Sequence, residues 1–166
     1  MAVRNVFRLL LSIGAVYIIG IIAFLIAAQL LPTWYASLNK PRFIPSDTLF
    51  VPIGMLICFL LGLSLYLIWN AGSVTKDRKF CLYLFVTMLI LNLVGLYVFF
   101  DLKSPFMALI TMIMQLAIVI STTIEAFRVS VPASILLIPY LIACLIAAIA
   151  SYLIIVMNPG LPLMVI

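Results

Sequence analysis

Residues 135–157 read ILLIPYLIACLIAAIASYLIIVM, an apolar run without a single Asp, Glu, Lys or Arg. A helix of about 20 such residues crosses the hydrocarbon core of a bilayer. Four more uncharged runs precede it, at 9–28, 49–69, 80–100 and 106–124. All are continuous rather than alternating, which favours helices over the strands of an outer-membrane barrel. The sequence therefore predicts an all-α integral membrane protein, a five-transmembrane-helix bundle.

The chain, 1–166, is expected to form one transmembrane domain. We predict helices at about 6–31, 48–70, 80–100, 105–126 and 132–157, and a long loop at 32–47, named the lid loop below. The later connections are short, so sequential helices should pack as neighbours. Ala23 and Ala27 have the spacing of small residues at close helix contacts, a weak indication of a homodimer.

Composition limits the chemistry of the chain. It is 68% apolar and 8% charged, and it contains no histidine. This excludes histidine bases, Ser/His and Cys/His nucleophile pairs and His-ligated metals. We therefore expect no catalytic residue, metal or cofactor. The net charge of +5 comes from short clusters between apolar runs rather than from a basic stripe, so nucleic acid is not an expected partner. Binding or transport of a ligand fits this composition best.

The basic residues predict the orientation of the chain. Positive residues favour the cytoplasmic side of a membrane. One set of connections and ends carries six of them and the other set carries three. The larger set is Arg4, Arg8, Lys76, Arg78, Lys79 and Arg128, and the smaller is Lys40, Arg42 and Lys103. A multi-pass protein with a cytoplasmic N-terminus and an outside C-terminus is predicted.

The lid loop stands out because it is the longest connection and carries three prolines. Long loops in compact domains often have a function, and proline stiffens the backbone. One interpretation is an ordered cover over the helix ends. The alternative is that Trp34, Tyr35 and Phe43 form only an interfacial aromatic belt, with Lys40 and Arg42 as anchors.

Polar side chains within the apolar runs should face protein rather than lipid. On the fourth run Thr111, Gln115, Thr122 and Glu125 share one helix face. Gln115 could grip a neighbouring carbonyl or Asn92, or it could contact a ligand. Pro139 leaves a backbone group of the fifth helix without its helical hydrogen bond. Asn92 could bond to that group, or it could donate a hydrogen bond to a ligand oxygen. Pro139 should bend the fifth helix and leave volume beside it.

Several segments resemble one family. They are 34–45 (WYASLNKPRFIP), 50–53 (FVPI), Leu91-Asn92 with Phe99-Phe100, Thr122-Thr123, 128–133 (RVSVPA) and 136–141 (LLIPYL). In this order they are similar to the signature segments of the TspO/MBR family, the translocator or tryptophan-rich sensory proteins. The pattern runs in register from Trp34 to about Asn158.

The chain also departs from that pattern. Phe43 stands where the pattern has a tryptophan, Gly54 and Cys58 replace the WxxLY of the second helix, and Gly95 and Ala143 replace two further tryptophans. Trp34 and Trp69 are the only tryptophans in the sequence. Loss of the indole rings could enlarge a cavity or let Leu and Met side chains fill it. Weaker binding of porphyrin than in tryptophan-bearing relatives is expected.

The resemblance implies a bundle with a ligand cavity closed by the lid loop, often as a homodimer. The expected ligand is a hydrophobic small molecule, either porphyrin, sterol or lipid-like, in a membrane lipid environment. The implied ligand-binding residues are Trp34, Tyr35, Pro41, Pro45, Pro52, Ile53, Asn92, Phe99, Gln115, Pro139, Tyr140, Ala143 and Ala147. Two alternatives remain at this point: a scaffold that recruits a partner and has no ligand, and a porphyrin-degrading enzyme.

Overall fold

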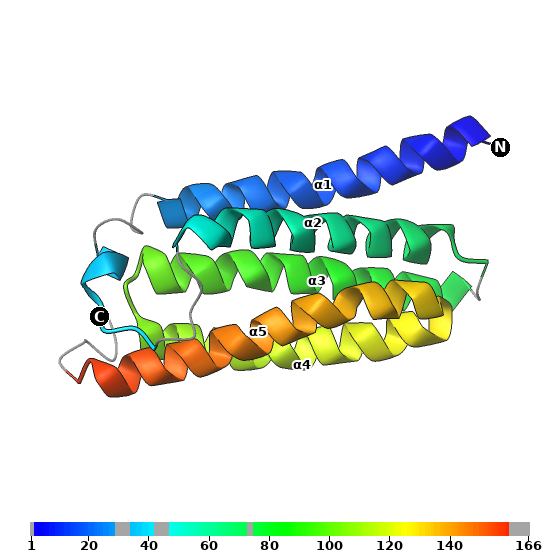
Figure 1. Cartoon of the computed structure of the whole chain (residues 1–166). Helices are drawn as coiled ribbons and strands as arrows, with labels where there is room; N and C mark the ends of the chain where they lie inside the picture. The colour runs from blue at the N-terminus through cyan, green and yellow to red at the C-terminus, as the bar shows by residue number, and fades with distance from the viewer. Residues whose placement is uncertain (1, 29–33, 42–46, 73–74, 160–166) are drawn as a thin grey trace.

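The computed structural model describes residues 2–28, 34–41, 47–72 and 75–159. Within them five long helices run side by side as a bundle (Figure 1). Each of the five is long and apolar enough to cross a membrane. The helices are α1 (Ala2–Ala28), α2 (Asp47–Asn70), α3 (Thr75–Phe100), α4 (Pro105–Val129) and α5 (Val131–Met157).

The helix bounds differ from the sequence-based prediction mainly at charged ends. α3 begins at Thr75 rather than at 80, and α4 continues to Val129 rather than ending at 126. The prediction followed the uncharged runs, whereas the helices continue through charged turns beyond them. α1 likewise begins at Ala2 rather than at 6, and its predicted end at 29–31 lies outside the described residues.

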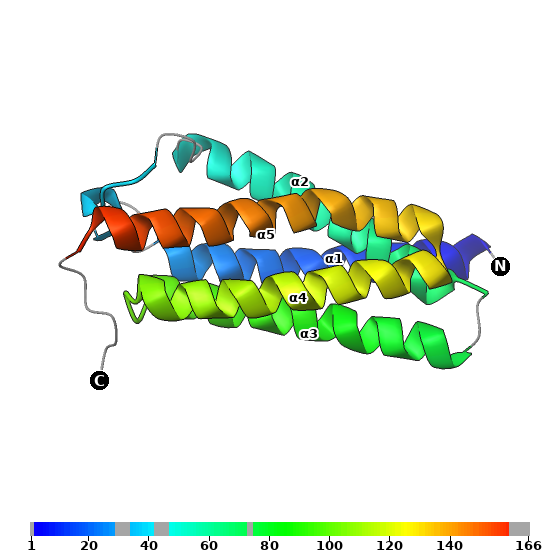
Figure 2. The same ribbon diagram turned by 90° about the horizontal axis from the view of Figure 1, so that it is seen from below.

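Around the bundle the neighbouring helices follow the order α1, α2, α5, α4, α3, and α3 returns to α1 (Figures 1 and 2). The expectation that all sequential helices pair was wrong for α2 and α3. These two contact each other only slightly, because α2 packs mainly on α1 and α5. A buried hydrogen bond from Ser64 Oγ to the Ala133 carbonyl, 2.9 Å long, joins α2 to α5.

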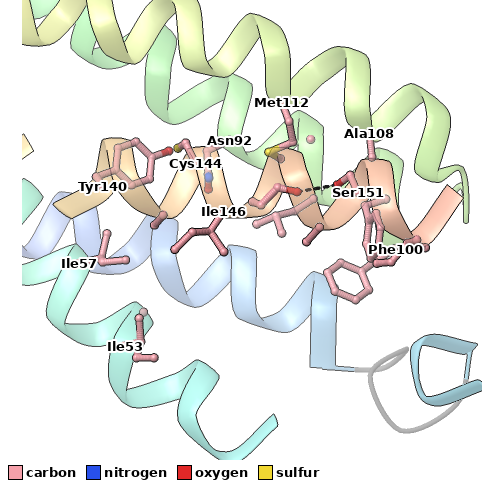
Figure 3. A pocket seen from close by; sticks show the side chains of 18 of the residues that line it. Ile53, Ile57, Asn92, Phe100, Ala108, Met112, Tyr140, Cys144, Ile146 and Ser151 are labelled. Carbon is pink, nitrogen blue, oxygen red and sulfur yellow. Dashed lines mark hydrogen bonds between the residues drawn. The ribbon is translucent and has the colours of Figure 1, made fainter. Parts of the chain in front are cut away.

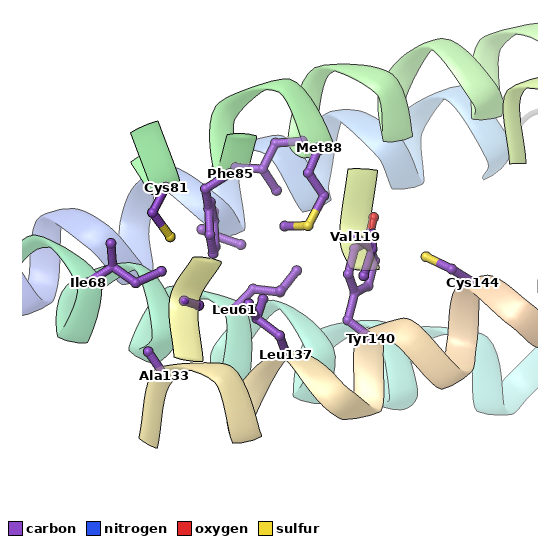
Figure 4. Close-up of a cluster of buried hydrophobic side chains, with 13 residues drawn as sticks. Leu61, Ile68, Cys81, Phe85, Met88, Val119, Ala133, Leu137, Tyr140 and Cys144 are labelled. Carbon is purple, nitrogen blue, oxygen red and sulfur yellow. The ribbon is translucent and has the colours of Figure 1, made fainter. Parts of the chain in front are cut away.

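The packed core fills the half of the bundle near the start of α1. Its fully buried members include Ile68, Phe85, Met88 and Leu137, drawn from α2, α3 and α5 (Figure 4). Tyr140 and Cys144 close this cluster toward the middle of the bundle. Large apolar side chains also cover the outside of the bundle, as expected for a surface that faces lipid.

Helices α1 and α2 approach closely at one glycine. A Cβ atom placed on Gly62 would lie 2.8 Å from the Cα atom of Ile13 on α1. The obstacle is backbone, which cannot move aside as a flexible side chain can. Gly62 therefore sets the distance between the two helices, as small residues do at membrane helix contacts.

Replacing this glycine should destabilise the bundle. Gly62→Ala is expected to force α1 and α2 apart and cost about 1–3 kcal/mol, as overpacking does. Thermal unfolding in detergent, followed by circular dichroism, should show a lower midpoint. Gly14→Ala on α1 is the matched control, because a Cβ there meets nothing within 4 Å. Equal midpoints for the two variants would contradict the close approach.

Candidate functional site

The described part of the lid loop packs onto one end of the bundle. Tyr35 is only 4% exposed, and it packs with Leu38, Phe100 and Ile154 in one cluster. The rings of Trp34 and Tyr35 both meet Phe99 edge-on, with centroids 5.6 and 6.0 Å apart. Burial of Tyr35 favours the cover over the interfacial belt for residues 34–41. Phe43 and Pro45 lie outside the described residues.

Two asparagines fasten the lid loop to the end of α5. The backbone N–H of Asn39 donates to Asn158 Oδ1, and Asn158 Nδ2 donates back to the Asn39 carbonyl, both at 3.0 Å. Asn158 Nδ2 also donates to the Ile154 carbonyl at 2.8 Å. The Lys40 ammonium lies 4.2 Å from the centre of the Tyr35 ring. The loop is thus held by its backbone as well as by its aromatic side chains.

Beneath Tyr35 the bundle contains a cavity of about 390 Å³ (Figure 3). Its wall is overwhelmingly apolar, and α2, α3, α4 and α5 all contribute to it. On the α2–α5 side the wall includes Ile53 and Ile146, each 42% exposed, so the cavity is not fully enclosed there. The lining residues are Tyr35, Ile53, Gly54, Ile57, Asn92, Gly95, Leu96, Phe99, Phe100, Ala108, Met112, Tyr140, Ala143, Cys144, Ile146, Ala147, Ala150, Ser151 and Ile154.

About half of the sequence-predicted site residues line this cavity. They are Tyr35, Ile53, Asn92, Phe99, Tyr140, Ala143 and Ala147. Trp34, Pro41, Pro52, Gln115 and Pro139 are not among the lining residues. Pro52 and Pro139 are exposed on the outside of their helices, Trp34 packs on Phe99 from the loop, and Gln115 is buried behind Tyr140.

Three of the positions that differ from the family pattern are part of the wall. Gly54, Gly95 and Ala143, where that pattern has tryptophans, all line the cavity. The Met112 side chain lies against Gly95, since a Cβ on Gly95 would lie 2.7 Å from Met112 Cε. A methionine thus occupies the space beside this glycine, and an open cavity lies next to it.

The inner end of the cavity carries its polar groups. Gln115 Nε2 donates to the Met88 carbonyl at 3.0 Å and to the Tyr140 hydroxyl at 2.7 Å. Asn92 and Cys144 lie beside the same hydroxyl (Figure 3). Of the two hydrogen-bond partners within the protein that we expected for Gln115, a neighbouring carbonyl and Asn92, the carbonyl is the one observed. Arg128 and Glu125 form an ion pair at 2.8 Å at the other end of this helix.

Sequence reasoning missed several lining residues. Met112 on α4 and Cys144 on α5 carried no signal beyond apolar character, which most of the chain shares. Ser151 follows Ala143 and Ala147 at four-residue spacing, and that ridge of small residues was a usable signal for the α5 wall. Ala27, the other small-residue indication, packs with Ile26 against the Tyr35 cluster, so it is engaged within the chain.

Five helices that can span a membrane, four of them around an apolar cavity and residues 34–41 of the first loop packed over one end, define a multi-pass membrane protein built around an internal pocket. The sequence model of the TspO/MBR family matches residues 12–157, most of the chain. The protein belongs to the TspO/MBR family.

Curated relatives agree along the chain. A tryptophan-rich protein TspO of Archaeoglobus fulgidus is 36% identical over 154 residues, covering 93% of this chain and 99% of that protein. Another tryptophan-rich protein TspO, from Chlorobaculum tepidum, is 28% identical and covers 94% of this chain and 99% of its own length. The translocator protein of Bos taurus is 31% identical over 120 residues, 72% of this chain and 71% of that protein.

The two hydrogen bonds between Asn39 and Asn158 form what we call the asparagine clasp. Its loss should loosen the lid loop. Asn158→Leu removes both hydrogen bonds to Asn39, each worth about 0.5–1.5 kcal/mol net. We expect the Asn39 amide to exchange its hydrogen about tenfold faster, measured by hydrogen–deuterium exchange in detergent. Ser37→Ala is the control, because the Ser37 hydroxyl bonds only within the loop, to the Trp34 carbonyl. Unchanged exchange in Asn158→Leu would show that the clasp does not hold the loop.

Proposed function

We propose that this protein is a membrane receptor or carrier that binds a hydrophobic small molecule, porphyrin, sterol or lipid-like, in the cavity beneath Tyr35. The observation that carries the proposal is the apolar cavity itself. Core packing normally leaves few voids larger than a water molecule, whereas this bundle keeps about 390 Å³ free between four helices. Concave, mostly apolar space with a few polar groups is typical of small-molecule sites.

The lid loop supports the same proposal. The hydrogen bonds between Asn39 and Asn158 and the aromatic cluster hold residues 34–41 over this end of the cavity, so ligand exchange would require these residues to move or the ligand to pass between α2 and α5. A scaffold without a ligand would gain from a filled interior, because each buried void loses packing energy. A binding role, rather than catalysis, also fits the absence of histidine from the sequence.

Two expectations about the surroundings of the protein stay predictions. The structure puts Arg8, Arg78 and Arg128 at the end of the bundle away from the lid loop, and Lys40 and Lys103 at the lid end. The positive-inside rule then places the N-terminus in the cytoplasm and the lid loop outside. The second prediction is a homodimer, which the family resemblance implies.

Filling the cavity should abolish ligand capture. Ala147→Trp puts a large ring into the wall, whereas Ala117→Trp makes the same change at an exposed position of α4. Mass spectrometry of small molecules that copurify in mild detergent should detect at least one species with the wild type and Ala117→Trp, and lose it with Ala147→Trp. Identical profiles for all three proteins, or no bound species in any, would count against the proposal.

Porphyrin should bind weakly. The cavity wall has neither the tryptophan faces of the family pattern nor, among its described lining residues, any Lys or Arg to pair with the propionates of a porphyrin. Titration with protoporphyrin, followed by its absorbance and by tryptophan fluorescence, should give a dissociation constant of micromolar or weaker, about −8 kcal/mol or less favourable. Submicromolar binding to the wild type that is lost in Ala147→Trp would identify porphyrin as a ligand and contradict this expectation.

A further inference from the structure

The inner end of the cavity is built around one buried amide. The Gln115 side chain is 0% exposed, and its Nε2 lies 3.0 Å from the Met88 carbonyl oxygen of α3 and 2.7 Å from the Tyr140 hydroxyl of α5. Three helices therefore meet at this group. A glutamine in a membrane interior is costly unless it is hydrogen-bonded, so its position there needs a reason.

The Met88 carbonyl fixes which way the amide faces. A carbonyl oxygen can only accept, so the amide atom beside it must be Nε2 and not Oε1, because two oxygens 3.0 Å apart would repel. The NH₂ group has two hydrogens. One goes to Met88 and the other to the Tyr140 oxygen. Gln115 is thus held as a donor toward Tyr140.

This arrangement sets the direction of the Tyr140 hydroxyl hydrogen. The oxygen accepts from Gln115, so its own hydrogen must point away from Gln115. Tyr140 lines the cavity, with Asn92 and Cys144 beside the hydroxyl (Figure 3). The cost of this geometry is visible at Gln115 Oε1, which is buried and makes no hydrogen bond to the described residues. Such a cost, about 1–3 kcal/mol, is tolerated where it serves a site.

A second hydroxyl of the cavity wall, on α5 nearer to the lid loop, is already hydrogen-bonded within its own helix (Figure 3). Ser151 Oγ donates to the Ala147 carbonyl of its own helix at 2.9 Å. Among the described residues that line the cavity none is Asp, Glu, Lys or Arg. The wall thus offers a directed hydroxyl donor in an apolar and uncharged setting.

We propose that Tyr140 is the specificity-determining residue of the cavity and that Gln115 is its positioning residue. The inference rests on the proposed function and names the class of ligand. This class is an uncharged, mainly apolar molecule with one hydrogen-bond acceptor oxygen, such as a ketone, ester or ether. The Tyr140 hydroxyl donates to that oxygen. A hydrocarbon of the same shape cannot accept the hydrogen bond from Tyr140. A carboxylate must lose its hydration on entering the cavity, and the described residues of the wall supply no cation to pair with it.

The first experiment compares benzophenone with diphenylmethane, which share a skeleton and differ by a carbonyl in place of a methylene. Dissociation constants are measured by isothermal titration calorimetry for the purified full chain in detergent. The ratio of the two constants, compared between a variant and the wild type, cancels the different partition of the probes into micelles. We expect Tyr140→Phe to reduce the preference for the ketone about tenfold and to leave diphenylmethane binding within about twofold.

Two further variants separate the roles. Tyr152→Phe is the matched control, because it removes the same phenolic hydroxyl from an exposed tyrosine of α5 that does not line the cavity, and it should keep the wild-type ratio. Gln115→Leu keeps the Tyr140 hydroxyl but lets its O–H bond rotate freely. The preference for the ketone should therefore fall to a value between those of the wild type and Tyr140→Phe. Infrared spectra of bound benzophenone give an independent readout of the hydrogen bond. The carbonyl band should be shifted to lower frequency in the wild type and Tyr152→Phe, unshifted in Tyr140→Phe, and broadened in Gln115→Leu.

A second probe pair tests charge. Methyl diphenylacetate should bind at least about tenfold more tightly than diphenylacetate at neutral pH, because the charged form must be desolvated. Equal affinity within this pair would overturn the uncharged class.

The outcomes distinguish this inference from the proposed function. If both first-pair probes bind and Tyr140→Phe leaves their ratio and the infrared band unchanged, the role of Tyr140 is wrong and the cavity still binds ligands. If neither probe binds the wild type, the proposed function fails for this class of molecule and the inference fails with it.

Discussion

The structure depends on one constraint of the membrane interior: polar groups there must find partners within the protein. The helices meet this requirement for the backbone, most hydroxyl side chains bond to a carbonyl of their own helix, and two buried side chains reach across helix boundaries. Ser64 bonds to Ala133 between α2 and α5, and Gln115 joins α3, α4 and α5 through Met88 and Tyr140. These contacts fix the helices around a shared axis, and they divide the bundle at Tyr140 into a packed half and a hollow half.

The hollow half follows from side-chain size. Gly54, Gly95, Ala143 and Ala147 face a space that neighbours could fill only partly, and Met112 does so beside Gly95. The lid loop then closes the end, with Tyr35 buried against Phe100 and Asn39 bonded to Asn158. Small residues, a flexible methionine and a loop held by hydrogen bonds together make a cavity with a mainly apolar wall and a polar inner end where Tyr140 and Asn92 meet.

Much of the fold could be predicted from the sequence, since five uncharged runs longer than a bilayer core allow few arrangements. The order of helices around the bundle could not, because it depends on which faces fit together, and α2 turned out to prefer α5 over α3. The site divides in the same way. Tyr35, Asn92 and Ala143 were found through the family pattern, whereas Met112 and Cys144 look like any other apolar residue of a membrane helix. Gln115 was recognised as unusual, but its role behind Tyr140 depends on a 2.7 Å contact between distant positions.

The account is tested most directly by locating a small apolar molecule inside the protein. Crystals grown from a lipidic mesophase and soaked with iodobenzene would report its position through the anomalous signal of iodine. We expect a peak in the space bounded by Gly95, Ala143 and Tyr140, beneath Tyr35. Iodine found only on the lipid-facing surface, with Met112 and its neighbours filling the interior, would contradict the central claim.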